Sequence, residues 1–542
     1  MGNRILIIAI ALFFLNPGLS FGQDLDKSEK LNILWLSVED MSPRLGSYGD
    51  NTVPTPNIDR LAKEGVRYTK AFSTAGVCAP SRCSIITSMY QTSVGGHNMR
   101  TSNIYPEVKG VPKNYSIVPP PYVKGFPEYL RANGYYCTNN VKTDYQFQPT
   151  PTLWDENSNT AHYKNRLKGQ SFFAIFNSTI THESQIWQRS KNQLRVNPSK
   201  VKVPPFYPDT DSVRLDIARH YSNISEMDDW VGEKLKELED AGDLENTIIF
   251  FWSDHGDGLP FFKREITDRG LHVPLIIRYP DKQNAGTLVH DLVSLIDLGP
   301  TTLSLAGIEP PGYMQGQPFA GKYKAKPRTY IFGARDRMDV PVDRVRSIRD
   351  QHFRYVKNFH PELPAYQHIT YRLQQPVMRE ILRQKEAGQL NEIQLQWFKA
   401  PKAVEELYLL DTDPFELKNV AGDPAYQKDL IRLRKALEEW IVQTNDWGKT
   451  PEPEMLKQMW NGGSEPPVTE DPIIIAKNGA ITISDKTEGA SIGYQVIDEE
   501  NEKSKSWKVY TEPFTLSKGM KVVAVAQRIG YQKSKEITFE LK

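Results

Sequence analysis

Two of the chain's three cysteines lie close together, in the segment Cys78-Ala79-Pro80-Ser81-Arg82-Cys83. Three cysteines allow at most one disulfide, which excludes a disulfide scaffold, and the chain lacks the paired Cys-x-x-Cys elements of a zinc finger. Pro80 suits the first turn of a helix, so Cys78 would lie near the positive end of the helix dipole, which stabilises anions. Cys78 is therefore predicted to be a specialised thiol. For Cys83 we expect a small buried thiol, with a bridge to Cys137 as the alternative.

Acidic residues and histidines follow three apolar runs further along the chain. The runs NILWLS, SFFAIFN and TIIFFWS are short and nearly continuous, which is typical of strands buried on both faces of a sheet. In a parallel sheet, ligands bind beyond the carboxyl ends of the strands. We therefore expect one shared site built from the residues that follow these runs: Glu39 and Asp40, His182, and Asp254 and His255.

Helical segments alternate with these strands. In TPNIDRLAKEG, Thr55 can cap a helix, Pro56 suits its first position and Gly65 ends it. A longer helix is predicted from about Ile217, where apolar residues recur three, four and seven apart, and Gly242 ends it. This alternation predicts an α/β fold, in which a mostly parallel sheet is covered by helices on both faces.

The pattern changes after the predicted α/β domain, residues 30–326. RVRSIRDQHFRYVKNF predicts two amphipathic strands and YQKDLIRLRKALEEWIVQT a helix, so we expect a smaller α+β subdomain over 327–447. Residues 448–466 are rich in proline and glycine, as a linker is. Alternating apolar and polar residues between glycine-containing turns predict a β-sandwich module over 467–542. Because this module has no cysteine and no cluster of histidine or acidic residues, we assign it no catalysis.

The first residues have the order of a secretory signal peptide. Arg4 gives a basic start, an apolar run follows from Ile5 to Leu15, and small residues lie near Ser20 and Gly22. The run is short for a membrane span, although a single N-terminal anchor is the alternative. We therefore expect residues 1–22 to be removed near Gly22. The mature protein is expected in the periplasm or secreted, without a stable membrane span.

Composition gives few hints about partners. The chain has 542 residues, 39% of them hydrophobic, so it can build large packed cores in two or three units. Its 67 basic and 66 acidic side chains leave a formal charge of +1. That balance gives no global argument for a nucleic acid or a membrane surface as partner, and no nucleic acid is expected.

The segment around Cys78 has the form Cys-x-Pro-Ser-Arg and resembles the signature of the type I sulfatases. NILWLSVED, TPNIDRLAKEGVRYTKAFST, SDHG and ELYLLDTDPFELKNVAGDP also resemble segments of that family, so the resemblance extends from about Asn32 to Asp423. RDRMD and VRSIRDQHFRYVKNF resemble the branch of arylsulfatases, heparan N-sulfatases and bacterial polysaccharide sulfatases. GAITISDKTEGASIGYQV and VAVAQRIGYQKS, in the tail, resemble the C-terminal β module of chitobiases and hexosaminidases. The family resemblance implies an alkaline-phosphatase-like sheet flanked by helices.

The resemblance also implies a chemistry for the site. In that family the cysteine is oxidised to formylglycine, so a formylglycine-generating or anaerobic sulfatase-maturating enzyme is an implied partner, and one Ca²⁺ per site is the implied metal. The implied catalytic residues are Cys78 as formylglycine, Arg82 beside it, Lys142 and Lys263 gripping the sulfate, and His182 protonating the departing alcohol. The implied metal ligands are Glu39, Asp40, Cys78, Asp254 and His255.

These residue types suit the reaction. A sulfate monoester resists attack because its oxygens repel a nucleophile, so the site needs positive charge and an activated oxygen. A hydrated formylglycine offers two hydroxyls: one can attack sulfur, and the other can then expel sulfate and regenerate the aldehyde. Carboxylate ligands select Ca²⁺ or Mg²⁺.

The sequence departs from the family pattern at several positions. The first metal position is usually Asp and here is Glu39, and the fourth is often Asn and here is His255. Many members have Lys-x-His where this chain has Lys142-Thr143-Asp144, so Asp144 or His97 is a candidate for the missing histidine's role. Thr87-Ser88 replaces the usual Thr-Gly after the motif.

Further charged residues are candidates for sugar contacts, because charges beyond the sulfate subsite can select a uronic acid or a ring position. They are His97, Arg100, Asp144, Arg335, Asp336, Arg337 and Asp339. The resemblance permits sulfated glycosaminoglycans, N-sulfated or O-sulfated, and algal polysaccharides such as ulvan. We therefore expect an exported sulfatase that acts on a sulfated carbohydrate.

Two other functions stay open at this point. The same fold occurs in phosphodiesterases and phosphonate hydrolases, and a catalytically silent glycan-binding homologue would keep the scaffold. Comparing activity on a sulfate ester with activity on a phosphodiester would distinguish a sulfatase from a phosphodiesterase or phosphonate hydrolase. For the tail, a spacer or glycan-contact role and a docking role on the main domain are equally open.

Overall fold

The computed structural model describes residues 30–101, 108–497, 504 and 506–541. The predicted signal peptide, residues 1–22, lies outside the described residues. Within the described ranges, no helix combines the length and the hydrophobicity that crossing a membrane requires.

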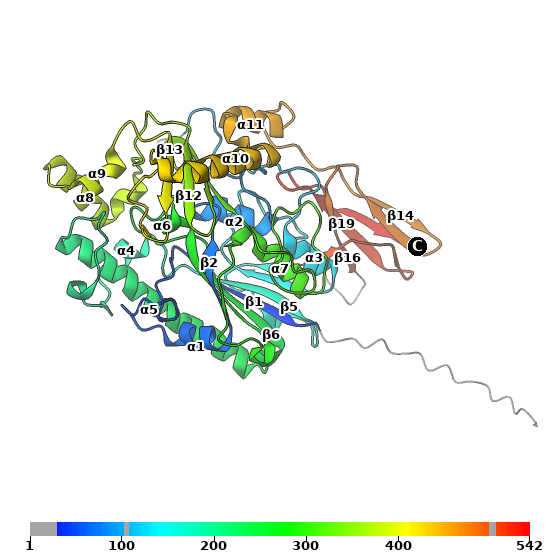
Figure 1. Ribbon diagram of the computed structural model, residues 1–542. Coiled ribbons are helices and arrows are strands. Elements are labelled where there is room, and N and C mark those ends of the chain that lie inside the picture. Colours follow the sequence, from blue (N-terminus) through cyan, green and yellow to red (C-terminus); the bar gives the residue numbers. More distant parts are fainter. Residues whose placement is uncertain (1–29, 102–107, 498–503, 505, 542) are drawn as a thin grey trace, which may run out of the picture. The chain divides into compact units, whose positions relative to one another are not determined.

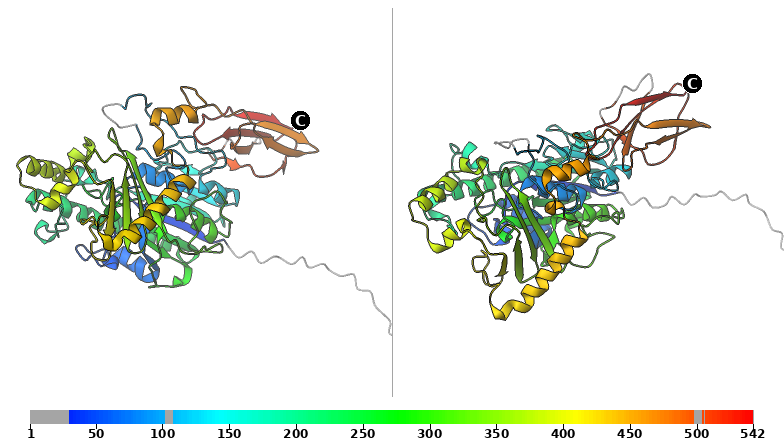
Figure 2. Two further views of the ribbon diagram at one scale, coloured as in Figure 1. Left: turned by 45° about the horizontal axis from the view of Figure 1, so that its top comes forward. Right: turned by 90° about the horizontal axis from the view of Figure 1, so that it is seen from above.

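Among the described residues, a nine-stranded sheet lies between layers of helices (Figures 1 and 2). Its order is β4-β3-β5-β1-β6-β7-β2-β8, and β9 pairs with β2. Most neighbouring strands run parallel, whereas β7 is antiparallel to both β6 and β2, so the predicted mostly parallel α/β sheet is confirmed. The strands are β1 (Asn32–Val38), β2 (Val66–Phe72), β3 (Tyr136–Asn140), β4 (Glu156–Asn157), β5 (Phe172–Ser178), β6 (Thr247–Ser253), β7 (His272–Arg278), β8 (Leu288–Val289) and β9 (Val293–Ser294).

Alternation along β1 explains why helices cover both faces. Ile33 and Trp35 pack in one core with α2, α3 and α7, and Leu34 and Leu36 pack in a second core with α1, α5 and α8. Because successive side chains of a strand point to opposite faces, a continuously apolar strand needs cover on both. These helices are α1 (Pro56–Glu64), α2 (Cys78–Thr87), α3 (Phe126–Ala132), α5 (Asp211–Asp240), α7 (Leu298–Leu305) and α8 (Pro376–Glu386); the short helices are α4 (Gln185–Gln188), α6 (Asp268–Leu271) and α9 (Glu392–Leu395).

Helix α5 begins six residues before the predicted Ile217, at Asp211. The side chain of Thr210 accepts a hydrogen bond from the backbone N–H of Val213, and such an N-cap satisfies a donor of the first turn. The predicted start was late because the apolar pattern shows only where the helix is buried, whereas the N-cap residue determines where the helix begins.

A second, four-stranded antiparallel sheet lies in the described C-terminal half of the chain, in the order β10-β11-β12-β13. Leu433, Leu437 and Trp440 of α10 (Gln427–Gln443) pack with Ile348 and Leu407 of this sheet. The two predicted strands and the predicted helix are thus present. The strands are β10 (Ile331–Arg337), β11 (Val342–Arg349), β12 (Phe353–Asn358) and β13 (Glu405–Leu409).

The stretch 448–466, predicted to be a linker, contains helix α11 (Glu452–Met459). Met455, Leu456 and Met459 are buried and belong to the same core as one face of the central sheet. The linker prediction is therefore wrong over this helix. Its prolines misled the prediction because proline is also common in the first turn of a helix.

Two antiparallel sheets form the C-terminal module in its described part, with orders β14-β15-β18 and β17-β16-β19-β20. Ile481 and Ile483 of one sheet pack against Val522 and Ala524 of the other, as the predicted β-sandwich requires. The strands are β14 (Ile473–Lys477), β15 (Ala480–Ser484), β16 (Ser491–Ile497), β17 (Lys508–Val509), β18 (Phe514–Thr515), β19 (Lys521–Gln527) and β20 (Ile537–Glu540).

Polar contacts join the module to the main domain. Lys124 Nζ donates to the carbonyl of Gly489 at 2.6 Å and to Ser491 Oγ at 2.8 Å, and Arg131 donates to the carbonyl of Trp507. These contacts favour the docking role that the sequence left open.

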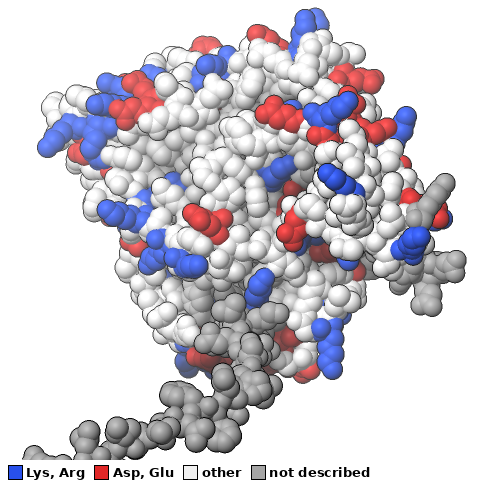
Figure 3. Space-filling model, turned by 90° about the vertical axis from the view of Figure 1, so that its right-hand side faces the viewer, with Lys and Arg blue, Asp and Glu red and all other residues white. Residues whose placement is uncertain are grey.

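Figure 3 shows lysines, arginines and acidic residues interspersed among uncharged side chains on one face of the molecule. Proteins that follow a polyanion's backbone through charge alone need an extended basic surface. On this face, recognition of a charged polymer would therefore depend on specific pockets rather than on bulk charge.

Candidate active site

Cys78 is the first residue of α2 and is buried, with 1% of its surface exposed. Pro80 occupies the first turn, as predicted. Ser81 Oγ donates to the carbonyl of Asp254 at 2.7 Å, and Arg82 Nε donates to Asp254 Oδ2 at 3.0 Å. These bonds fix the N-terminal end of α2 against the carboxyl end of β6, so the thiol faces the edge of the sheet where a site was expected.

The two acidic pairs meet at that edge. Asp40 follows β1 and Asp254 follows β6, and the backbone N–H of Asp40 donates to Asp254 Oδ1 at 3.1 Å. One ligand atom each from Asp40, Asp254 and His255 lie within 4.8 Å of one another, and all three residues are fully buried. The convergence predicted from the strand ends is therefore present in the structure.

This group fits a divalent cation. His255 Nε2 lies 3.1 Å from Asp40 Oδ1 and 3.7 Å from Asp254 Oδ1. Among the described residues, His255 Nε2 and Asp40 Oδ1 are buried and face each other at 3.1 Å, and neither has a further hydrogen-bond partner. Buried donor atoms that turn toward one another in this way can share a ligand between them. Carboxylate oxygens suit Ca²⁺ or Mg²⁺, and an imidazole nitrogen also suits transition metals. Burial lowers the pKa of His255, but Asp254 and Asp40 raise it to about 10, so a bound cation would replace that proton.

Glu39 lies beside this group rather than in it. Its Oε1 is 2.7 Å from Lys142 Nζ and 3.8 Å from the Arg82 guanidinium. The carboxylate therefore holds the lysine that was predicted to grip sulfate, and its predicted role as a metal ligand has no support from these contacts.

Lys263, the second predicted sulfate-binding lysine, is almost fully buried and lies 2.6 Å from Asp40 Oδ2. Burial alone would raise the pKa of Asp40, but Lys263, His182 and His255 lower it well below its ordinary value. Asp40 is therefore ionised, and Lys263 stands directly beside the group that fits a cation.

His182 follows β5 and contacts the same edge. Its Nδ1 lies 3.3 Å from the backbone N–H of Ser184, which can only donate, so the neutral ring carries its proton on Nε2. Burial, and the nearby charge of Lys263, lower the pKa of His182. Proton donation to a leaving group requires the protonated ring, the imidazolium, whose Nε2–H is the proton available to a substrate in the site. The lowered pKa makes that proton easier to give up, and it also makes the protonated form the smaller fraction at neutral pH.

Glu183 and Arg264 are site residues that the sequence analysis missed. Arg264 donates to both carboxylate oxygens of Glu183, at 3.0 and 2.8 Å, and Lys263 Nζ lies 3.1 Å from Glu183 Oε1. The backbone N–H of Glu183 also donates to Asp40 Oδ2 at 2.7 Å. Glu183 thus fixes the turn that carries His182 and holds Lys263. Its place directly after His182 was the only signal in the sequence.

Replacing Glu183 with glutamine is expected to destabilise the protein by about 3 kcal/mol, because it leaves a buried guanidinium without its charge partner. kcat/KM is expected to fall about tenfold as Lys263 loses one of its two carboxylates. Glu237→Gln is a matched control, because Glu237 contacts several cations but is a quarter exposed, so its loss should cost less than about 1 kcal/mol. Urea unfolding and steady-state kinetics measure both effects, and equal stability losses in the two variants would contradict this role.

Five of the predicted sugar-contact residues have other surroundings. His97 is 3% exposed and lies near Arg346 and Asp446, and burial lowers its pKa to about 4. Three of the others form buried ion pairs inside the protein: Arg335 with Glu265 and Asp343, Asp336 with Arg346, and Arg337 with Glu452. The fifth, Asp339, accepts a hydrogen bond from Arg337 through its backbone carbonyl. Because these charges are already paired within the protein, their contacts give no support to a carbohydrate role. The sequence could not show these pairs, since the fold forms them.

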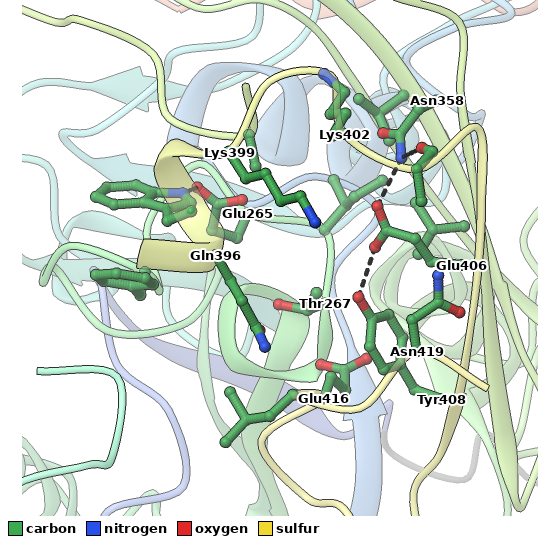
Figure 4. Close-up of a pocket in the computed structure, with 18 of the residues that line it drawn as sticks. Glu265, Thr267, Asn358, Gln396, Lys399, Lys402, Glu406, Tyr408, Glu416 and Asn419 are labelled. Carbon is green, nitrogen blue, oxygen red and sulfur yellow. Dashed lines mark hydrogen bonds between the residues drawn. The ribbon is translucent and has the colours of Figure 1, made fainter. Parts of the chain in front are cut away.

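Arg335 lines a cavity of about 490 Å³ (Figure 4). Glu265 and Thr267, which follow Lys263 in the chain, line the same cavity. Its polar wall includes Glu406, which accepts from Tyr408 Oη at 2.6 Å and from Asn358 Nδ2 at 2.7 Å. Lys399 points into the space between the two walls in this view. The cavity is separate from the thiol of Cys78, so it is not the candidate active site.

All three cysteines are free. Cys83 is fully buried in the core that includes α2, as expected for a small buried thiol. The alternative of a bridge between Cys83 and Cys137 is therefore wrong. Cys137 Sγ instead lies 3.8 Å from the carbonyl of Pro127.

Comparisons with known proteins agree with this geometry. A family model described as sulfatase matches residues 31–308. An ulvan-active sulfatase of Formosa agariphila is 46% identical, over 95% of this chain and 92% of that protein. The N-sulphoglucosamine sulphohydrolase of Homo sapiens is 27% identical, over 78% of this chain and 92% of that protein. This chain belongs to the sulfatase family and is a sulfuric ester hydrolase.

The fold alone would not decide the reaction. The phosphonate monoester hydrolase of Agrobacterium radiobacter superposes with a TM-score of 0.54 at 18% identity, over 77% of this chain and 97% of that chain. Such a likeness shows a shared fold and no more. The family match and the 46% identical relative favour the sulfatase over the phosphonate hydrolase and over a silent homologue.

Proposed function

We propose that this chain is an exported sulfatase that removes sulfate groups from ulvan-type polysaccharide after Cys78 has been converted to formylglycine. The observation that carries the substrate is the 46% identity, over nearly the whole chain, to a protein named as an ulvan-active sulfatase. Export by residues 1–22 to the periplasm or the medium is part of the proposal, because a large polysaccharide is met outside the cell. A formylglycine-generating or anaerobic sulfatase-maturating enzyme is the proposed partner.

The surroundings of Cys78 support this modification site. Burial raises the pKa of the thiol, but Arg100, His255 and Lys142 lower it below its ordinary value, so the pocket favours negative charge at this position. When formed, a hydrated formylglycine would supply the nucleophilic oxygen and a second hydroxyl for expelling sulfate. A Ca²⁺ held by Asp40, Asp254 and His255 would supply Lewis-acid polarisation of a sulfate oxygen.

The chain's own cations and histidine divide the remaining work. Lys142 and Lys263 are held by different carboxylates, Glu39 and Asp40, and both lysines lie close enough to Cys78 to interact with its charge. They would bind sulfate oxygens at that position. In a water-poor site such fixed charges stabilise a transition state strongly. His182 in its protonated form would give its Nε2 proton to the departing sugar oxygen and return to the neutral imidazole, since a poor alkoxide leaving group needs a proton as the bond breaks.

Sulfate release from ulvan, heparan, chondroitin and carrageenan oligosaccharides tests this function. The protein should be co-produced with a maturation enzyme, and mass spectrometry should show conversion of Cys78. We expect the highest kcat/KM on ulvan oligosaccharides. Faster release from heparan would overturn the substrate but keep the reaction, whereas full activity with an unmodified thiol would overturn the mechanism.

A further inference from the structure

Arg100 is a cation in direct contact with the reacting position. Its Nη1 lies 3.4 Å from Cys78 Sγ and 2.9 Å from Asp144 Oδ2. About 31% of the Arg100 side chain is exposed, against 20% for Lys142, 4% for Arg82 and 2% for Lys263. Arg100 therefore touches the buried sulfur and is also open to a substrate that enters the site.

Asp144 orients this guanidinium together with Lys142. Lys142 Nζ lies 3.2 Å from the same Asp144 Oδ2 that accepts from Arg100. Asp144 adopts a left-handed backbone conformation with φ of 52°, which costs a residue other than glycine about 1 kcal/mol or more and is typical of functional sites. One carboxylate thus holds two cations whose charges both act on Cys78.

The charge balance leaves Arg100 available to an anion. Lys263 lies between the carboxylates of Asp40 and Glu183, and Lys142 has Glu39 besides Asp144. Among the described residues, the one carboxylate in an ion pair with Arg100 is that of Asp144, which Arg100 shares with Lys142. Within this described set Arg100 is therefore the least neutralised of these cations. A guanidinium presents paired N–H donors that match two oxygens of an oxyanion.

We propose that Arg100 is a catalytic residue that binds the transferred sulfate group itself, with Asp144 as its positioning residue, rather than a residue that reads the sugar. A sulfate whose sulfur is next to position 78 must present its oxygens within hydrogen-bond reach of that position. Arg100 Nη1 is already within 3.4 Å of it. The inference rests on the sulfatase reaction taking place at Cys78.

The test compares Arg100→Gln and Arg100→Lys on two substrates, a small aryl sulfate and an ulvan oligosaccharide. Loss of one oxyanion donor is expected to lower kcat/KM about 100-fold on both substrates, and lysine should restore part of it. Asp144→Asn, which keeps both cations but loosens them, should cost about tenfold on both. A loss confined to the oligosaccharide would show that Arg100 reads the sugar and would overturn the proposal.

A binding measurement separates this result from a failure of the proposed function. Inorganic sulfate is titrated calorimetrically into protein that keeps an unmodified Cys78. The dissociation constant should rise at least about tenfold in Arg100→Gln. Arg166→Gln is the matched control, because Arg166 forms a part-buried bidentate pair with Asp243, at 2.8 and 2.9 Å, away from Cys78. Equal sulfate affinity in Arg100→Gln and the wild type would overturn the proposal even if no substrate were turned over.

Discussion

Replacing Cys78 with alanine is expected to lower kcat at least about 10⁴-fold, because position 78 is the only source of the nucleophilic oxygen in the proposed reaction. The fold should survive the change. The thiol is buried beside Val77, Met99 and Met338 in a small cluster, so removing one sulfur atom costs about 1 kcal/mol of unfolding free energy. Sulfate release and thermal melting of the matured protein measure the two effects.

Cys83→Ala is the matched control for this prediction. Cys83 lies on the same helix, is fully buried and packs only in the core, so its loss should cost similar stability and leave kcat within about twofold of the wild type. Activity that disappears in both variants would mean that damage to α2, rather than loss of the nucleophile, explains the first result.

The edge of the sheet where the site lies could be predicted because local features determine it. Each buried strand is a continuous apolar run, and the chain turns polar where the strand leaves the core, so Asp40, His182 and Asp254 were found at strand ends. A separate local signal, Pro80, predicted that Cys78 lies near the start of a helix, where α2 has it. In a parallel sheet the carboxyl ends of the strands lie at one edge, so residues at these ends are expected to lie close together even when their contacts are not known.

The charge partners could not be predicted, because tertiary structure decides them. Arg337 pairs with Glu452, 115 positions along the chain, and Arg335 pairs with Glu265, 70 positions away. In the sequence both arginines look like free cations available to a sugar. Arg264 likewise pairs with Glu183, 81 positions away, and only the fold shows that this pair holds Lys263.

Helix α11 illustrates a conflict between composition and packing. Proline and glycine around residues 451–463 indicate a linker, yet Met455, Leu456 and Met459 are buried together. The burial of a short apolar stripe outweighs the local signal, since most helical stability in proteins comes from packing.

Replacing Asp254 with asparagine is expected to weaken binding of a divalent cation at least about 100-fold, because it removes a charged donor from the group formed with Asp40 and His255. The change also disturbs two hydrogen bonds, since Asp254 accepts from Arg82 Nε at 3.0 Å and from the backbone of Asp40 at 3.1 Å. The measurements are metal content per protein by elemental analysis and the melting temperature with and without a chelator.

Asp257→Asn separates loss of the metal from loss of a buried charge. Asp257 is fully buried three residues further on, and it pairs with Arg44 and with His220 Nε2 at 3.0 Å, outside the group that fits a cation. Breaking that pair should destabilise the protein by about 3 kcal/mol. The chelator effect should persist, since a cation at 100 times its dissociation constant contributes about 2.7 kcal/mol. In Asp254→Asn the chelator effect should vanish together with sulfate release. If Asp254→Asn kept a full equivalent of metal and its chelator effect, Asp254 would not be a ligand and the buried carboxylates would serve only as partners for Arg82 and Lys263.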